Sequence, residues 1–165
     1  MRYGAFGFTG FLYLCFAGAL LATLRGGRFE RVAALLIAME GLGRIGAGYF
    51  PCDPGCVQVS PGPNLHKLFA TIGFSSGILA SFLWGFLLRR IPSFRPLSSF
   101  SVGCGAVALV FLAIMAWASD AALPSGLFEH LATVVLSVWL LAFAGRLVWA
   151  ENATARAPDY LRTAG

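Results

Sequence analysis

The stretch Glu40–Lys67, EGLGRIGAGYFPCDPGCVQVSPGPNLHK, holds most of the unusual chemistry of this chain. It begins with an acid and a base inside an apolar run, continues through a proline-rich loop with two cysteines, and ends at a histidine and the sole lysine. Long apolar runs lie on both sides of it. The stretch therefore indicates the connection between two membrane-spanning helices, with a polar site close by.

The composition is typical of a membrane protein. Of the 165 residues, 58% are hydrophobic and 12% are charged, and the apolar runs have about the 20 residues that a helix needs to cross the bilayer hydrocarbon. Backbone polar groups in lipid must pair internally, so such runs are helices. A net charge of +5 would suggest nucleic acid for a soluble protein. Here the arginines sit at the ends of apolar runs, where they set topology, so we expect membrane lipids as partners and no nucleic acid.

We predict an all-α transmembrane bundle of five spans. No proline lies inside a predicted span, as expected because a proline in a helix interior removes a hydrogen bond and clashes. A cleaved signal peptide fits poorly, since the first apolar run is long, a group of basic residues follows it, and no clean small-residue cleavage site is present. The spans cover about 3–24, 32–50, 65–88, 97–118 and 127–149, in a single domain of residues 1–150 with a polar cytoplasmic tail at 151–165.

The arginines predict the orientation of the bundle. They gather at alternate span ends and in the tail: Arg25, Arg28, Arg31, Arg89, Arg90, Arg95, Arg146, Arg156 and Arg162. The opposite side has only Arg2, before the first span, and Lys67, at the start of the third. Positive residues favour the cytoplasmic side. We therefore expect the N-terminus outside and the C-terminus in the cytoplasm.

Small residues recur every fourth position along the third span: Gly73, Gly77, Ser81 and Gly85. Such a stripe lets two helix backbones approach closely in lipid. We favour packing inside the bundle, with contact to another membrane protein or a second copy as the alternative. Gly41, Gly43 and Gly46 also match a dinucleotide-binding pattern, but that pattern requires a preceding strand. These glycines more simply give the second span a thin face.

Glu40 and Arg44 form an acid–base pair within an apolar run. Four residues apart, they share a helix face with the acid toward the N-terminus, which is the favourable order. If Phe50 marks the outer boundary, Glu40 lies about 15 Å below it and Arg44 about 9 Å. An unpaired charge near the bilayer centre costs about 2.5–3.5 kcal/mol, so both should face the interior. The pair either fixes helix register or belongs to a binding or proton-handling site.

The loop after Phe50 contains the sequence PCDPGC. Outside the cytoplasm, Cys52 and Cys56 on either side of a turn can form a disulfide. A metal site that adds Asp53 and His66 is the alternative, but this is not a standard zinc spacing. We expect the disulfide, with neither a metal ion nor a cofactor. The two remaining cysteines lie within spans and are expected to be inert core thiols: Cys15 and Cys104.

Ionisable residues also begin the third and fifth spans on the predicted outer side: His66 and Lys67 on one, Glu129 and His130 on the other. Singly, each is explained as an interfacial residue that extends its polar tip to water. Together with the acid–base pair below them, they indicate a polar pocket that opens outward.

Two segments resemble the membrane family called domain of unknown function 998. They are Gly41-Leu42-Gly43, Gly46, Gly48, Phe50-Pro51, Asp53-Pro54 and His66, and then Gly126-Leu127-Phe128-Glu129-His130-Leu131 with Trp139 and Arg146-Leu147. Family members usually have Arg after the Glu, where this chain has His130. Tyr3-Gly4 and Gly7 resemble the start of the family's second helix, which implies a five-helix or N-terminally shortened version. The resemblance implies a multi-pass protein of a bacterial-type inner membrane and no established activity.

Our preferred functional hypothesis is a protein whose outward-facing pocket binds or processes a lipid or another amphipathic ligand. Arg44 would hold an anionic head group, and His66 would serve as an acid or base because histidine titrates near neutral pH. The candidate catalytic residues are His66, Glu129 and His130, and the candidate ligand-binding residues are Glu40, Arg44, Asp53 and Lys67.

The alternative hypothesis is a non-catalytic accessory subunit or assembly factor of a larger membrane complex. The small size, the short loops and the small-residue stripe favour it. A transporter or proton path through Glu40 is a weaker third hypothesis, because we find neither an inverted repeat nor a span broken by proline.

Overall fold

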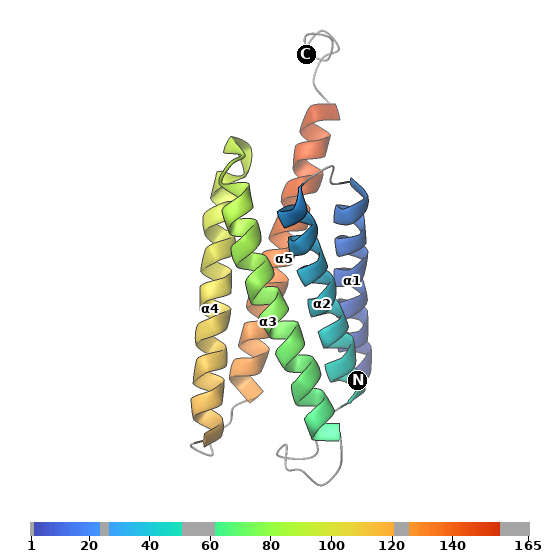
Figure 1. Cartoon of the computed structure of the whole chain (residues 1–165), viewed down its shortest axis with the longest axis vertical. Coiled ribbons are helices and arrows are strands. Elements are labelled where there is room, and N and C mark those ends of the chain that lie inside the picture. Colours follow the sequence, from blue (N-terminus) through green and yellow to red (C-terminus); the bar gives the residue numbers. More distant parts are fainter. Residues whose placement is uncertain (1, 24–26, 51–61, 121–125, 156–165) are drawn as a thin grey trace.

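The structure, a computed structural model, describes residues 2–23, 27–50, 62–120 and 126–155. In these ranges it has five long helices (Figure 1): α1 (Arg2–Thr23), α2 (Arg28–Tyr49), α3 (Gly62–Leu88), α4 (Arg95–Asp120) and α5 (Gly126–Ala155), with a 3₁₀ turn, η2 (Pro92–Phe94), before α4. Each long helix is apolar enough to cross a membrane. The predicted all-α, five-span architecture is confirmed, while the side that each terminus faces stays a prediction.

The helix ends differ slightly from the predicted ones. α2 begins at Arg28 rather than Val32, and α5 continues to Ala155, into the predicted tail. Pro63 and Pro96 lie in the first turns of α3 and α4. Proline is tolerated there because the first N–H groups of a helix have no partner within it.

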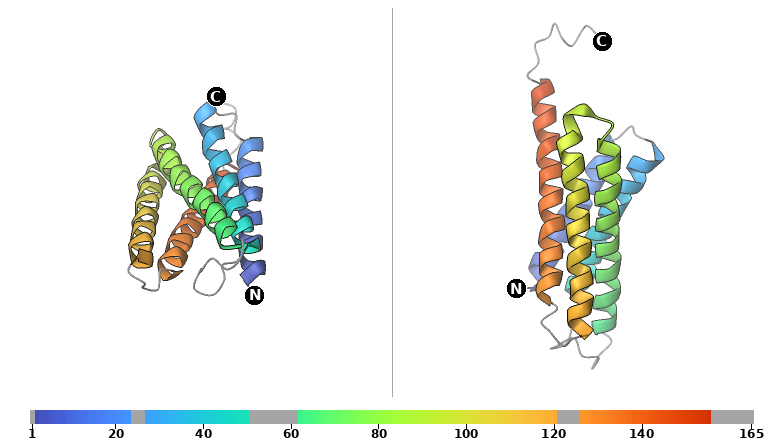
Figure 2. Two further views of the ribbon diagram at one scale, coloured as in Figure 1. Left: turned by 60° about the horizontal axis from the view of Figure 1, so that its bottom comes forward. Right: turned by 90° about the vertical axis from the view of Figure 1, so that its left-hand side faces the viewer.

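The helices run alternately in opposite directions, so the bundle has two chemically different ends. Consecutive helices lie side by side, and α5 also contacts α3 (Figure 1). α5, orange to red in Figure 2, projects beyond the other helices at the end where it finishes. We call this the arginine end, because its described residues include Arg28, Arg31, Arg89, Arg90 and Arg95. The opposite end, where α1, α3 and α5 begin, is the N-terminal end.

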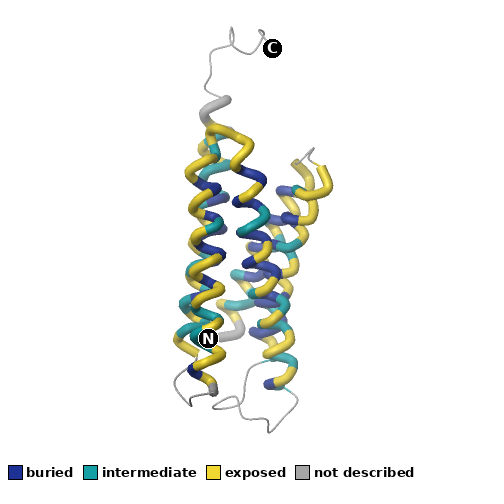
Figure 3. Tube along the Cα trace, turned by 60° about the vertical axis from the view of Figure 1, so that its left-hand side comes forward, coloured by how far each residue is buried: buried dark blue, intermediate teal, exposed yellow. Residues whose placement is uncertain are grey.

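Buried residues line the facing sides of the helices, and exposed residues cover the outside (Figure 3). The outer surface is nevertheless apolar: it includes Phe8, Leu79, Val110 and Leu141. Lipid tails are as apolar as these side chains. In a membrane, the hydrophobic effect therefore does not favour burying this surface inside the protein.

Glycines bring the helices into close contact near the N-terminal end. A Cβ atom on Gly43 of α2 would lie 2.5 Å from the Cα atom of Gly73 on α3, and one on Gly10 of α1 would lie 2.6 Å from the carbonyl oxygen of Gly41. No side chain fits at such positions. The three helices therefore approach backbone to backbone, and we call these contacts the glycine half of the bundle.

The small-residue stripe of α3 divides between two neighbours. Gly73 and Gly77 face α2, while Ser81 and Gly85 lie against Gly105 and Val102 of α4. All four stripe residues are buried within this chain. They serve internal packing in this structure, and contact through them with another protein stays a proposal.

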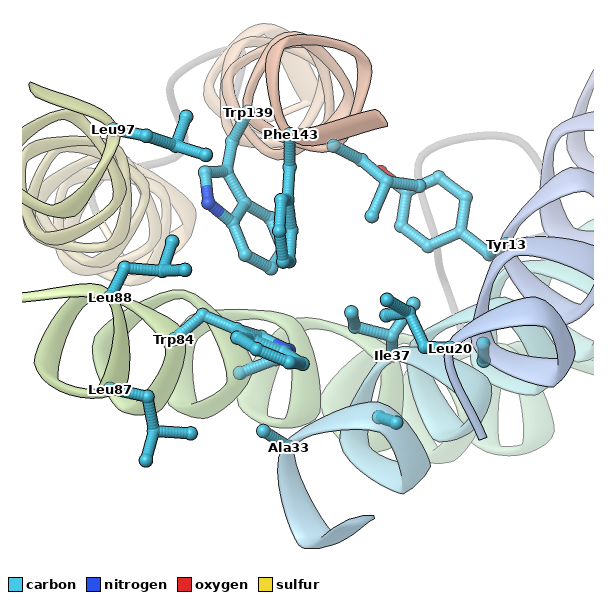
Figure 4. Close-up of a cluster of buried hydrophobic side chains, with 14 of the residues drawn as sticks. Tyr13, Leu20, Ala33, Ile37, Trp84, Leu87, Leu88, Leu97, Trp139 and Phe143 are labelled. Atoms are coloured by element: carbon cyan, nitrogen blue, oxygen red, sulfur yellow. The ribbon is translucent and has the colours of Figure 1, made fainter. Parts of the chain in front are cut away.

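Large side chains fill the interior toward the arginine end (Figure 4). The ring of Phe143 lies 4.8 Å from that of Trp84 and 5.5 Å from that of Phe16, between centroids. Trp139 Nε1 donates a hydrogen bond of 2.9 Å to Ser101 Oγ on α4. We call this the aromatic half. The two halves meet where α2 carries its acid–base pair.

Candidate functional site

Glu40 and Arg44 lie on one face of α2, as their spacing predicts. The Arg44 side chain donates from Nη2 and Nε to Glu40 Oε1, over 2.8 and 3.3 Å. Glu40 is 1% exposed and Arg44 7%. The pair thus sits inside the bundle, where each charge compensates the other.

Two further helices complete the surroundings of Arg44. Its Nη2 donates to Tyr13 Oη of α1 over 3.0 Å and lies 3.4 Å from the carbonyl oxygen of Thr133 on α5. Its Nη1 donates to Ser137 Oγ of α5 over 3.2 Å, and the guanidinium carbon lies 4.4 Å from the centroid of the Tyr13 ring. Arg44 therefore ties α1, α2 and α5 together at one depth.

Glu40 has one carboxyl oxygen without a partner. Oε2 is buried and makes no hydrogen bond to any residue that the structure describes. It lies beside Gly77 of α3, where a Cβ atom would come within 2.5 Å of it. The N–H groups in the interior of α3 are bonded within the helix, so that backbone offers Oε2 no donor. An orphaned acceptor of this kind costs about 1–3 kcal/mol, which makes it a candidate for binding something else.

A hollow lies next to the pair. Its enclosed part has room for about one water molecule, and the empty space of about 310 Å³ around it includes space that is open to the outside. Helices α1, α2, α3 and α5 contribute its wall, which consists of Phe6, Glu40, Gly43, Arg44, Ala47, Ala70, Gly73, Phe74, Glu129 and Thr133. Apart from the pair, Glu129 and Thr133, this wall is apolar.

His66 and Glu129 bring α3 and α5 together beside the hollow, whose wall includes Glu129. His66 Nε2 lies 3.5 Å from Glu129 Oε1, and both side chains are partly exposed. The Nδ1 atom of His66 lies 2.9 Å from the carbonyl oxygen of Ala47 and 3.1 Å from that of Phe50. These two oxygens are at the end of α2, so the imidazole links three helices. Glu129 belongs both to this contact and to the wall of the hollow.

The other predicted site residues do not join this arrangement. Lys67 and His130 are exposed, and His130 Nδ1 lies 2.7 Å from the carbonyl oxygen of Gly126 on its own helix. Asp53, Cys52 and Cys56 lie outside the described residues. The other two cysteines are free; Cys104 is buried, but Cys15 is exposed. The expectation of a core thiol is therefore wrong for Cys15, because that face of α1 points away from the bundle.

Tyr13, Ser137 and Thr133, which surround Arg44, were not among the predicted site residues. Tyr13 and Ser137 are polar residues inside otherwise apolar runs, and a buried arginine needs several acceptors. That need could have directed attention to them. The positions of the polar residues along α1 and α5 do not indicate which of them would face Arg44.

The sequence matches the family described as "Protein of unknown function (DUF998)" over residues 2–146. This chain is therefore a multi-pass membrane protein of that family, as the resemblance implied. No curated protein and no solved structure matches the chain.

Proposed function

We propose that this protein binds an amphipathic ligand, a lipid or a lipid-like molecule, in the hollow beside Glu40 and Arg44. The single observation that carries the proposal is the buried, unpartnered Glu40 Oε2 in a residue that lines that hollow. A charged side chain inside the bilayer is costly. Ionisable residues there are therefore taken as functional candidates by default.

The shape of the hollow suits such a ligand. Ala70 and Phe74 give it an apolar wall on α3, and the buried acid–base pair forms another part of its wall. Glu129 of the wall and its partner His66 are partly exposed, so they can exchange protons with water or with a bound head group. A molecule with an apolar body and one polar group fits this distribution.

The setting that we propose follows the arginine pattern. The arginine end faces the cytoplasm of a bacterial-type inner membrane, and the hollow opens on the outer side near a Cys52–Cys56 disulfide. The described arginines of the loops and helix ends support this placement, because five of them lie at one end of the bundle.

The test asks whether the hollow retains a molecule. The protein is extracted into mild detergent from vesicles of phosphatidylethanolamine and phosphatidylglycerol, and bound lipids are detected by native mass spectrometry. Ala70→Phe places a ring in the hollow, while Leu79→Phe adds the same ring to a lipid-facing position of α3 that is 55% exposed. We expect a retained lipid in the wild type and in Leu79→Phe, and its loss in Ala70→Phe.

Equal retention by all three proteins would overturn the proposal. Absence of a retained lipid together with a stoichiometric protein partner would favour the alternative, an accessory subunit. Circular dichroism of each variant establishes that the helices are intact.

A further inference from the structure

We infer that the ligand of this hollow presents a hydrogen-bond donor, best a protonated primary amine, to Glu40 Oε2. This inference rests on the proposed function and specifies its ligand. It reverses the expectation that Arg44 receives an anionic head group.

Arg44 has little left to offer an anion. Its Nε and Nη2 atoms donate to Glu40 Oε1, Nη2 also reaches Tyr13 Oη, and Nη1 donates to Ser137 Oγ. One N–H of Nη1 is left outside these bonds, so an anion could accept a single hydrogen bond and would have to break these contacts to gain more. Losing Arg44 from Glu40 would leave a carboxylate buried without its cation.

The acceptors at the hollow are, in contrast, incompletely used. Glu40 Oε2 has no donor among the described residues. The second carboxylate of the wall belongs to Glu129, which forms an ion pair only with His66 among those residues. Neither Lys67 nor any described arginine besides Arg44 lines the hollow. Its polar groups therefore favour a donor with a positive charge over an acceptor with a negative one.

An N–H donor, and not charge alone, is what Oε2 lacks. Gly77 lets this oxygen lie against α3, since any larger residue there would overlap it. A quaternary ammonium group would bring its charge but no hydrogen, and its methyl groups would hold the charge away from the oxygen. A charge-assisted N–H···O bond is about twice as strong as a neutral one. The site should thus discriminate between amines by their hydrogens.

The experiment uses four probes with the same chain: dodecylammonium, dodecyltrimethylammonium, dodecanol and dodecanoate. Their affinities are measured in phosphatidylcholine nanodiscs from the ligand-dependent rise in unfolding temperature. We expect dodecylammonium to bind about tenfold more tightly than dodecyltrimethylammonium, dodecanol to fall between them, and dodecanoate to bind weakest.

Variants assign this preference to the hollow. Glu40→Gln should reduce the amine preference to about twofold or less, whereas Glu30→Gln, on the same helix at the arginine end, should leave it unchanged. Should Glu40→Gln fail to fold, Ala70→Phe serves instead, because it fills the hollow without altering the acid–base pair; it should abolish binding of all four probes.

The outcomes separate this inference from the proposed function. If the probes bind with equal affinity in the wild type and lose it in Ala70→Phe, the hollow binds amphiphiles and the donor inference is wrong. If Ala70→Phe changes nothing, the proposed function fails as well. Addition of phosphatidylethanolamine to the nanodiscs identifies the source of the amine: competition with dodecylammonium indicates a lipid head group, and its absence a free amine.

Discussion

The glycine half and the aromatic half solve the same packing problem in opposite ways. Near the N-terminal end, Gly43 and Gly73 let backbones touch. Toward the arginine end, Trp84, Trp139 and Phe143 fill the space with rings (Figure 4). Tyr13 belongs to both, because its ring lies in the aromatic cluster and its hydroxyl accepts from Arg44.

The difference shows why the hollow is where it is. Large side chains fill the interior of the aromatic half. In the glycine half the backbones of α2 and α3 meet, and Gly43 and Gly73 also belong to the wall of the hollow. The buried acid–base pair stands at the border between the two halves. Its partners come from three helices, and it should therefore be the most sensitive point of the bundle.

Arg44→Gln should have the largest effect on stability. It leaves the Glu40 carboxylate buried without its cation, and breaking a buried pair in this way costs about 3–5 kcal/mol. The measurement is the free energy of unfolding in mixed micelles with increasing sodium dodecyl sulfate. Arg90→Gln, an exposed arginine outside the pair, serves as the control and should change it by less than about 0.5 kcal/mol.

The double variant Glu40→Gln/Arg44→Gln sharpens this prediction. The double variant has no unpaired buried charge, because both charged groups are removed. Most of the stability lost in Arg44→Gln should therefore return. A double variant as unstable as the single one would mean that the contacts of Arg44 to Tyr13 and Ser137, rather than its charge, hold the helices together.

Gly43→Ala should have an intermediate effect. The added Cβ atom would lie 2.5 Å from the Cα atom of Gly73, and backbone cannot move aside as a side chain end can. We expect a loss of about 1–3 kcal/mol in the same micelle assay. Gly103→Ala is the matched control, since nothing lies within 4 Å of its added methyl group; it should be neutral or slightly stabilising. Equal effects of the two would show that the glycine half is not held by close backbone contact.

The sequence predicted the spans well because their signals are local. Apolar run length and proline placement determine where each helix lies, and the spacing of Glu40 and Arg44 determines their pairing. The candidate site was predicted less well. Consecutive helix residues do not share a face, so Glu129 and His130 could not both point inward, and neither could His66 and Lys67. In each pair only one does so, and which one depends on how the helix is rotated about its axis.

Trp139→Phe should have the smallest effect, and it tests the aromatic half alone. The substitution keeps an aromatic ring in a position that is 0% exposed and removes the 2.9 Å hydrogen bond to Ser101 Oγ. Ser101 still donates to the carbonyl oxygen of Leu97, so its hydroxyl is not left without a partner. Hydrogen bonds between membrane helices contribute about 0.6 kcal/mol on average, and we expect a loss near that value plus a small packing term.

The comparison of the two halves depends on what this variant does to ligand binding. Because the aromatic half does not line the hollow, Trp139→Phe should leave dodecylammonium affinity within about twofold of wild type, while Gly43→Ala, whose new methyl group enters the hollow's wall, should weaken it by about tenfold. A loss of affinity in Trp139→Phe as large as that in Gly43→Ala would show that the two halves act as one unit, and that the rings toward the arginine end hold the acid–base pair in its binding geometry.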